Sequence, residues 1–369
     1  MTLEQDLTVR VPRSDFLPDL LWVYDPDTRA SEPVDRRTDP DRWQQAADSD
    51  LPLTIQWDDG AHAGSAPGRL ATSSASQPSV VRAMLEDARL EPGMSVLEIG
   101  TGTGWSAALT AAIVGPDRVV TIEVDKAVAA AARKALDAAG ARVEAVRADG
   151  MLGFAARAPF DRVIATAGAR RIPKAWIEQT RPGGLIVTPW GTGYTHRDAV
   201  AVLTVAGDGT AAGQFTGPVE FMKIRADRGE IPDHSRYVPD GLAGARQSRS
   251  TLPVGETLGT AWDDPCAFVT GLVVSAIARN VDLRDPEAPA VWLYGLDDLS
   301  WAVAVQDGDG SNVWQGGTRS LWDEVQAAHD WWIATGGPEL ERFGITADGG
   351  GETAWLDEPG NGLPGWPCG

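Results

Sequence analysis

The fold class is decided by the stretch Val96-Leu97-Glu98-Ile99-Gly100-Thr101-Gly102-Thr103-Gly104-Trp105. Its apolar first part predicts a buried strand, and its three alternating glycines predict a tight turn. Glycines in such a turn let a ligand lie directly against the backbone. The alanine-rich residues 105–114 then predict a helix that ends at Gly115-Pro116. A strand, a glycine-rich turn and a helix in this order begin an open α/β sheet.

Strands and helices continue to alternate through the middle of the chain. We expect strands at 95–99, 119–124, 143–147, 161–166, 185–188 and 200–205, and helices at 105–114, 127–139 and 173–180. This alternation requires right-handed crossovers and a mostly parallel sheet that is covered on both faces. The predicted fold class is therefore α/β, with a doubly wound sheet.

The composition divides the chain into three parts, which we predict to be separate domains. Residues 1–69 form an extension rich in Asp, Pro and Arg whose two short apolar segments are each too small for a core. Residues 70–224 form the α/β domain. Residues 225–369 hold 9 of the 15 tryptophans and predict a small α+β domain, with a helix at 320–335 and strands at 290–293 and 301–305. We expect the Gly- and Pro-rich end, 347–369, to be ordered only by docking.

Charge narrows the possible partners. The net charge is -20, distributed as -7 over residues 1–69, +1 over 70–224 and -14 over 225–369. Nucleic acid and anionic membranes favour the opposite sign, so neither is an expected partner. The acidic flanks suit a basic peptide, although solubility alone also explains them.

Other features of the composition suggest a compartment and argue against metal. Residues 1–10 lack the apolar stretch of a signal peptide, and no run of about 18 apolar residues could span a membrane, so we expect a cytoplasmic protein. Two cysteines, Cys266 and Cys368, are too few for a disulfide framework or a cysteine zinc site. The four histidines lack ligand spacing, and we expect no metal site.

The glycine turn indicates which cofactor the sheet binds. Dinucleotide folds place a third glycine where this chain has Trp105, and the chain has no phosphate-binding P-loop. Glu98 would repel a pyrophosphate but not a cationic sulfonium. Glu123 ends the second expected strand, where a carboxylate can accept both ribose hydroxyls, and Asp149-Gly150 can meet an adenine amino group. These positions fit S-adenosylmethionine, although a tight turn, a helix cap and a surface acid would account for each of them separately.

Further motifs make the sequence resemble a known family. The chain contains Ala71-Thr72-Ser73-Ser74-Ala75-Ser76-Gln77-Pro78, Phe160-Asp161-Arg162-Val163-Ile164-Ala165-Thr166-Ala167 and Arg181-Pro182-Gly183-Gly184-Leu185-Ile186-Val187-Thr188-Pro189-Trp190-Gly191. Together with 97–107, these segments resemble the protein-L-isoaspartate O-methyltransferases over about residues 65–223. The resemblance implies a class I S-adenosylmethionine-dependent methyltransferase with a Rossmann-like sheet and S-adenosylhomocysteine as product.

The resemblance also implies the roles of individual residues. Ser74 matches the active-site serine of the family, with Ser73 and Thr72 beside it as further catalytic candidates. The candidate cofactor-binding residues are Glu98, Gly100, Thr101, Gly102, Gly104, Trp105, Glu123, Val124, Asp149 and Gly150. The family usually continues Ser-Ala-Pro-His where this chain has Ser74-Ala75-Ser76-Gln77, which predicts a different acceptor pocket.

The chemistry of methyl transfer limits what the acceptor site must contain. A carboxylate is already ionised near neutral pH, so the site needs no general base and must mainly align the reactants and exclude water. Hydroxyls around Ser74 can orient the acceptor, although Ser74 could instead cap a helix at 80–90. Candidate substrate-binding residues are Ser76, Gln77, Arg170 and Arg171, with a solvated surface role as the alternative for the two arginines.

The extra length suggests a specific acceptor. The architecture resembles an actinobacterial branch of the family that tailors ribosomally synthesised peptides (RiPPs) such as lanthipeptides and graspetides. This resemblance implies methylation of an aspartate in a macrocyclised precursor, after which the ester closes to a succinimide (aspartimide) and can open to isoaspartate. The alternatives are repair of isoaspartate in proteins, a non-catalytic binding protein with this fold, and a small-molecule methyltransferase.

Overall fold

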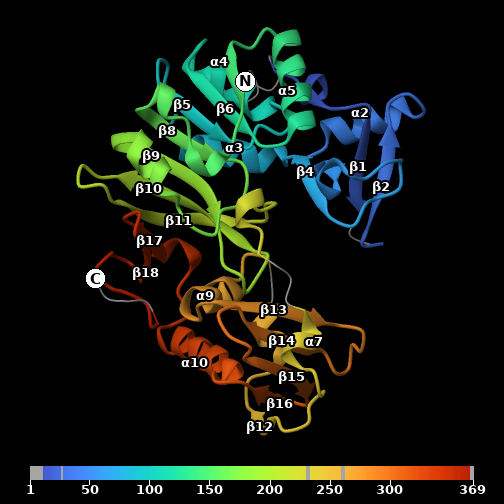
Figure 1. The fold of residues 1–369 in the computed structure, drawn as a ribbon, viewed down its shortest axis with the longest axis vertical. Helices are drawn as coiled ribbons and strands as arrows, with labels where there is room; N and C mark the ends of the chain where they lie inside the picture. The colour runs from blue at the N-terminus through green and yellow to red at the C-terminus, as the bar shows by residue number, and fades with distance from the viewer. Residues whose placement is uncertain (1–10, 26–27, 230–232, 259–261, 366–369) are drawn as a thin grey trace.

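The computed structural model describes residues 11–25, 28–229, 233–258 and 262–365, which form three β-sheets. Cys368 and the whole segment 1–10 lie outside the described residues, as do the other positions in the gaps. Figure 1 shows a large central sheet, a small N-terminal sheet to one side of it, and a separate C-terminal sheet at the other end of the molecule.

The central sheet has nine strands in the order β18-β17-β11-β10-β9-β8-β5-β6-β7. Its strands are β5 (Val96–Ile99), β6 (Val119–Glu123), β7 (Val143–Arg147), β8 (Phe160–Ala165), β9 (Thr180–Trp190), β10 (Asp198–Val205), β11 (Ala211–Val219), β17 (Phe343–Ala347) and β18 (Glu352–Leu356). Strands β5 to β9 pair in parallel, and the others pair antiparallel to their neighbours. The predicted α/β class is confirmed, with both faces of the sheet covered. The expectation of a mostly parallel sheet is corrected, because β10, expected in the parallel series at 200–205, pairs antiparallel to β9, and so do the strands beyond it with their neighbours.

Helices cover the two faces of the central sheet. They are α3 (Pro78–Asp87), α4 (Trp105–Val114), α5 (Lys126–Ala138) and α6 (Lys174–Gln179), with the short helices η3 (Gly150–Leu152) and η4 (Ala155–Arg157). The helix α4 is buried nearly all round, because its small alanines let it sit between the sheet and the neighbouring elements. The N-cap of α5 is Asp125, whose carboxylate accepts the Ala127 and Val128 amides.

The N-terminal part forms a compact unit, which the sequence did not predict. It contains η1 (Arg13–Phe16), β1 (Leu20–Asp25), β2 (Ala30–Asp35), α2 (Pro40–Asp48), β3 (Leu53–Trp57), η2 (Asp58–Gly60) and β4 (Ala71–Ala75). Leu21 and Leu53, from the two apolar segments, meet Trp43 of α2 in a shared core. Because β4 belongs to this sheet, the expected boundary at residue 70 falls just before a strand of the N-terminal unit. The division into three domains stays a prediction.

The C-terminal sheet is antiparallel, with the order β12-β16-β15-β14-β13. Its elements are β12 (Arg246–Ser250), β13 (Ile277–Asp282), β14 (Ala290–Gly295), β15 (Trp301–Asp307), β16 (Gly310–Gly316), α7 (His234–Tyr237), α8 (Val254–Leu258), α9 (Cys266–Val273) and α10 (Leu321–Ala334). The expected helix and both expected strands of this region correspond to α10, β14 and β15. Trp322 of α10 is fully buried in the core of this unit.

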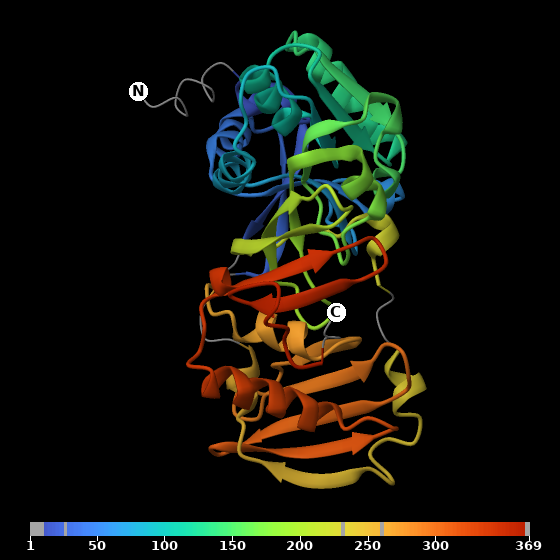
Figure 2. The same ribbon diagram turned by 90° about the vertical axis from the view of Figure 1, so that its left-hand side faces the viewer.

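After α10 the chain returns to the central sheet. The short helices η5 (Arg225–Asp227) and η6 (Leu340–Arg342) lie at the two crossings, and β17 then pairs with β11. Figure 2 shows the β17–β18 hairpin between the rest of the central sheet and the C-terminal unit. The expectation that 347–369 is ordered only by docking is corrected for β18, because Glu352–Leu356 is hydrogen-bonded along the whole of β17.

Helix α9 joins the C-terminal unit to the central sheet. Its Phe268 ring lies 4.9 Å from the ring of Phe215 on β11. A side chain at Gly271 would collide with Thr192, so the helix and the β9–β10 loop approach closely only because this residue is glycine. Tyr194, in the same loop, is buried in the core of the C-terminal unit, where the Arg279 guanidinium lies 4.6 Å from its ring. Cys266 of α9 is a buried free thiol.

Candidate active site

A cavity of about 390 Å³ opens at the carboxyl ends of β5 and β6. Ligands of doubly wound sheets bind at this edge. Its walls come from the glycine turn, from β4 of the N-terminal unit and from the segment 221–228 that follows β11. The predicted site residues that line it are Thr72, Ser73, Ser74, Ser76, Gly100, Thr101, Gly102, Trp105, Glu123, Val124, Asp149 and Gly150.

The glycine turn forms the floor of this cavity. Gly102 has a φ of 53°, a left-handed conformation that favours glycine, and a Cβ placed there would stand 3.4 Å from the Ser74 carbonyl oxygen. The turn therefore runs directly beneath β4. Thr101 is held from below by a 2.8 Å hydrogen bond between its hydroxyl and that of Thr121.

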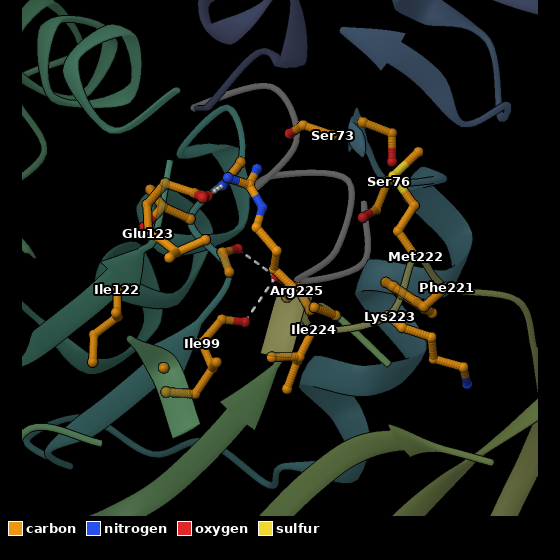
Figure 3. Close-up of a pocket in the computed structure, with 18 of the residues that line it drawn as sticks. Ser73, Ser76, Ile99, Ile122, Glu123, Phe221, Met222, Lys223, Ile224 and Arg225 are labelled. Atoms are coloured by element: carbon orange, nitrogen blue, oxygen red, sulfur yellow. Dashed lines mark hydrogen bonds between the residues drawn. The ribbon is translucent and has the colours of Figure 1, made fainter. Parts of the chain in front are cut away.

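Glu123 has two carboxylate oxygens that each retain room for a ligand. Oε2 accepts the Gly102 amide at 3.1 Å, and Oε1 accepts the Asp125 amide at 3.0 Å. Each oxygen still has a free lone pair, as a pair of ribose hydroxyls would require. Burial raises the pKa of Glu123 above its usual range. Figure 3 shows Glu123 on one side of the cavity and Ser73 and Ser76 on the other.

Asp149 and Gly150 close the adenine end of the predicted cofactor site. The Asp149 Oδ1 atom accepts the Met151 amide at 3.0 Å, which leaves its second oxygen without a partner among the described residues. The Gly150 carbonyl accepts the indole N–H of the buried Trp176 at 2.8 Å. This turn is therefore fixed by its own neighbours and presents one carboxylate oxygen to the cavity.

The hydroxyls of β4 are not equivalent. The Thr72 hydroxyl donates to Gln56 Oε1 at 3.0 Å and accepts the Asp59 amide at 3.1 Å, so its proton is already used. The hydroxyls of Ser73 and Ser74 have no hydrogen-bond partner within the described part of the chain. The register between β3 and β4 is irregular at this point, which lets two consecutive serines line the same cavity.

The structure removes one alternative for Ser74. Helix α3 begins at Pro78, and its N-cap is Gln77, which makes no side-chain cap. Ser74 lies inside β4, three residues earlier, and cannot cap this helix. The Ser74 hydroxyl therefore does not cap a helix.

Basic residues of the segment 221–228 form a wall that the sequence analysis did not predict. Lys223, Arg225 and Arg228 all line the cavity. Arg228 Nη1 lies 2.8 Å from Asp59 Oδ1 in the N-terminal unit. In the view of Figure 3, Arg225 lies between Glu123 and the two labelled serines, Ser73 and Ser76. The signal that the sequence offered for this wall was the cluster of Lys223, Arg225 and Arg228 at the start of the acidic C-terminal part.

Lys223 is anchored from behind rather than pointing at the cofactor site. Its ammonium is ion-paired with the buried Asp198 of β10, and in Figure 3 it points away from Glu123. Burial raises the pKa of Asp198 to about 6, while Lys223 opposes this rise. This ion pair fixes the start of the segment 221–228 against the sheet. The backbone of Lys223 also forms an isolated parallel β-bridge with Gly168.

Five predicted site residues do not line the cavity. They are Glu98, Gly104, Gln77, Arg170 and Arg171. Glu98 lies beneath the glycine turn, where its carboxylate accepts a hydrogen bond from the Thr121 hydroxyl, and burial raises its pKa to about 7. Gly104 is the N-cap of α4.

The other three have partners elsewhere. Gln77 donates to Asp50 Oδ2 at 3.1 Å, and Arg170 and Arg171 both contact Asp227. These contacts use only part of the donors of each arginine, so the substrate-binding role of Gln77, Arg170 and Arg171 stays a prediction for residues that do not line the cavity.

The described residues contain neither a candidate membrane span nor a candidate metal site. No helix there is both long and apolar enough to cross a membrane. No cluster of three or more His, Cys, Asp or Glu side chains within the described ranges has the arrangement to hold a metal ion.

The comparisons with known proteins agree on one family. The family model described as protein-L-isoaspartate(D-aspartate) O-methyltransferase (PCMT) matches residues 27–229. The protein-L-isoaspartate O-methyltransferase of Thermococcus onnurineus is 40% identical over 156 residues, which cover 42% of this chain and 70% of the relative. The enzyme of the same name from Pyrococcus horikoshii is 37% identical over 190 residues, covering 51% of this chain and 79% of the relative.

A solved structure extends the likeness in fold to nearly the whole chain. A structure titled protein-L-isoaspartate O-methyltransferase covers 97% of this chain and 96% of its own, with a TM-score of 0.56 at 18% identity. At that identity the match concerns the fold alone, but it includes the C-terminal unit. From the family model and the two relatives, the chain belongs to the protein-L-isoaspartate(D-aspartate) O-methyltransferase family of S-adenosylmethionine-dependent enzymes.

Proposed function

We propose that the protein transfers a methyl group from S-adenosylmethionine to the free carboxylate of an L-isoaspartyl residue in a peptide or protein. The observation that carries this proposal is the pair of unpartnered hydroxyls, Ser73 and Ser74, in the same cavity as Glu123 and the glycine turn. The curated relatives with matching sequence carry the corresponding name, which supports the same acceptor.

The residues of the cavity fit the cofactor. Glu123 offers two oxygens to the ribose hydroxyls, Asp149 offers one oxygen to the adenine amino group, and the glycine turn leaves the backbone open. When bound, S-adenosylmethionine supplies an electrophilic methyl group on a cationic sulfur. The family resemblance and the cavity together make these residues the proposed cofactor contacts.

The acceptor carboxylate needs orientation rather than activation. Ser74 and Ser73 are proposed to donate hydrogen bonds to one carboxylate oxygen, which directs the other toward the cofactor. No proton has to be removed, because the carboxylate is ionised near neutral pH. The wall formed by Arg225 and Arg228 against Asp59 helps to exclude water from this space.

A second candidate function is the tailoring of a macrocyclised RiPP precursor at an ordinary aspartate, as in the lanthipeptide- and graspetide-associated branch. One observation favours it: Ser76, in the segment where the sequence departs from the usual family motif, lines the cavity. The extra length does not favour it, because the solved structure titled protein-L-isoaspartate O-methyltransferase matches this chain over 97% of its residues. Isoaspartate is therefore the first acceptor to test.

Mass spectrometry separates these functions. The purified protein is incubated with S-adenosylmethionine and either a linear isoaspartyl peptide or a macrocyclised peptide that contains aspartate. Methylation of the isoaspartyl peptide, followed by loss of methanol, supports the proposal, and methylation of the cyclic peptide alone overturns it in favour of tailoring. Calorimetry with S-adenosylhomocysteine tests the remaining alternative, since a non-catalytic binding protein with a degenerate site would release no heat.

A further inference from the structure

A buried guanidinium lies outside the cavity, directly behind the strand that carries the serines. Arg13, at the start of η1, is only 5% exposed. Its Nη2 atom lies 2.9 Å from each of three backbone carbonyl oxygens, those of Leu51, Ala75 and Ser76. Its Nη1 atom donates to the Ser49 carbonyl at 3.3 Å. One side chain therefore ties η1, the end of α2 and the end of β4 together.

The end of β4 needs such a partner because its own pairing stops there. The register of β3 with β4 ends at Leu53 opposite Ala75. Three residues later the chain turns into α3 at Pro78, which has no backbone N–H to offer. Without Arg13, the buried Ala75 carbonyl and the half-buried Ser76 carbonyl would lose this donor. Arg13 supplies the donors that a neighbouring strand would normally provide.

Burial has not removed the charge of this guanidinium. Burial lowers the pKa of Arg13 to about 10, with Asp50 nearby opposing the change. The side chain therefore remains a cation at neutral pH, and it donates to carbonyl dipoles instead of a carboxylate. Hydrogen bonds from a charged donor are stronger than those from a neutral one, so this attachment is rigid.

The segment around Arg13 reaches a second wall of the cavity as well. The Arg13 guanidinium lies 5.9 Å from the ring of Trp105, and the indole N–H of Trp105 donates to the Val11 carbonyl at 2.9 Å. Trp105 lines the cavity at the start of α4. Residues 11–13 thus touch both the acceptor strand and the helix that follows the glycine turn.

We propose that Arg13 is a positioning residue for methyl transfer: it fixes the backbone at Ala75 and Ser76 so that the Ser73 and Ser74 hydroxyls are held at the cavity. This inference rests on the proposed function, because the serines are the proposed acceptor contacts. Helix α3 has a separate anchor, since Asp50 accepts the Ser79 amide at 2.8 Å. Loss of Arg13 therefore frees the end of β4 without freeing the helix behind it.

The test compares Arg13→Met, Arg13→Lys and the control Arg42→Met in the full chain. Methionine removes every donor, whereas lysine keeps the charge and can satisfy carbonyls clustered around one point. Arg42 forms an exposed ion pair with Glu32 in the same unit and touches no residue of the cavity. Kinetics with an isoaspartyl peptide, calorimetry with S-adenosylhomocysteine and hydrogen exchange of the segment 73–77 are measured for each variant.

We expect Arg13→Met to lower kcat/KM by about 100-fold, because small misplacements of positioning groups have effects of this size. Its affinity for S-adenosylhomocysteine should stay within about threefold of the wild type, and exchange at 73–77 should accelerate. Arg13→Lys should recover much of the activity, and Arg42→Met should behave as wild type. If Arg13→Met folds poorly, Arg13→Lys is compared with the wild type instead. We then expect Arg13→Lys to show a smaller loss in kcat/KM and a measurable rise in hydrogen exchange at 73–77.

Two outcomes would overturn the inference. One is unchanged kinetics and unchanged exchange at 73–77 in Arg13→Met. The other is a parallel loss of activity, cofactor affinity and thermal stability without recovery in Arg13→Lys, which would make Arg13 a general element of the fold. If wild-type protein methylates no isoaspartyl peptide, the proposed function fails separately, and the exchange of 73–77 together with the unchanged cofactor affinity still decides whether Arg13 fixes β4.

Discussion

The Arg225 Nη2 atom lies 2.9 Å from Asp59 Oδ1 and 3.4 Å from Asp125 Oδ2. Asp59 belongs to the N-terminal unit, whereas Asp125 caps α5 immediately after the strand that ends in Glu123. A single guanidinium that lines the cavity therefore joins the N-terminal unit to the central sheet. Arg228 adds a second contact to the same Asp59. Both arginines of this cluster line the cavity beside the predicted cofactor site.

Replacing Asp59 should weaken the retention of the cofactor product. Asp59→Asn keeps the left-handed backbone that this residue adopts, with φ of 53°, but removes its charge. Partly exposed ion pairs contribute at most about 1 kcal/mol, so we expect S-adenosylhomocysteine to bind about fivefold more weakly, chiefly through faster dissociation. Stopped-flow and calorimetry at low and high salt measure this, and the salt dependence should be smaller in the variant. Asp35→Asn, which removes an ion pair with Arg37 remote from the cavity, is the control.

Glu123→Gln should reduce cofactor affinity far more. The amide nitrogen of glutamine would face either the Gly102 or the Asp125 N–H, so one of the two donors loses its acceptor. Hydrogen bonds to a charged group contribute about 1.5–3 kcal/mol, which corresponds to a loss of about 10- to 100-fold in affinity for S-adenosylhomocysteine. Calorimetry gives the value. Equal affinity in Glu123→Gln and in the exposed control Glu144→Gln would contradict the assignment of Glu123 to the ribose.

Ser74→Ala should affect catalysis without affecting cofactor binding. The Ser74 hydroxyl has no partner among the described residues, so its removal leaves no buried group unsatisfied and should not alter the free energy of unfolding. We expect kcat/KM for the isoaspartyl peptide to fall by about 10- to 100-fold, the loss of a hydrogen bond to a charged acceptor. Thr72→Ser is the matched comparison, because serine can keep both hydrogen bonds of the Thr72 hydroxyl. A Ser74→Ala enzyme with wild-type kinetics would remove Ser74 from the proposed acceptor site.

Glu98 should make the protein less stable as the pH rises through neutrality. Burial raises the pKa of Glu98 from 4.5 to about 7 in the folded state, so the folded protein binds this proton more tightly than the unfolded chain does. Its favourable contribution is full below about pH 4.5 and is lost as the pH rises through about 7. Glu98→Gln should flatten the free energy of unfolding between about pH 5 and pH 8, by on the order of 3 kcal/mol at most.

Urea denaturation at several pH values measures this effect. Asp198 and Glu352, whose pKa values are raised by burial to about 6 and about 7, act in the same direction. Some slope should therefore remain in Glu98→Gln. An identical slope in the variant and the wild type would show that Glu98 stays ionised in the folded protein.

Tyr194 should couple the stability of the C-terminal unit to that of the central sheet. Its ring is buried in the core of that unit, and its hydroxyl has no hydrogen-bond partner within the described ranges. Tyr194→Ala should cost about 3–5 kcal/mol, as deletion of a buried aromatic ring usually does, and should make the C-terminal unit more sensitive to limited proteolysis. Tyr194→Phe keeps the ring and should be as stable as wild type or more so. Equal stability of the Ala and Phe variants would contradict this role.

The sequence predicts the central sheet well because its signals are local. Strands such as Val143–Arg147 and helices such as Trp105–Val114 coincide with the expected ranges, since each is bounded by its own glycines or caps. Strand β11 was not predicted, because Ala211–Val219 contains two glycines and a proline and reads as a loop. Its partners β10 and β17 hold it in place.

The candidate site divides in the same way. Gly102, Glu123 and Asp149 follow strands of the sheet and are predictable from their spacing. Arg13 and Asp59 have no local signal, because their roles depend on carbonyls and cations that lie far away in the sequence. Pairing across such distances is decided by the packing of the N-terminal unit, which periodicity does not encode.

The return of β17 to the edge of β11 means that the central sheet is completed only after the whole C-terminal unit has been synthesised. Ala211–Gln214 of β11 pair with Gly344–Ala347, and the whole C-terminal unit lies between these partners in the chain. At ordinary translation rates, β11 waits for its neighbour for roughly ten seconds after it leaves the ribosome. During that time the nascent chain carries an open strand edge, which other chains can use as a template. Closure by the β17–β18 hairpin therefore protects the newly made protein from aggregation, as well as completing its sheet.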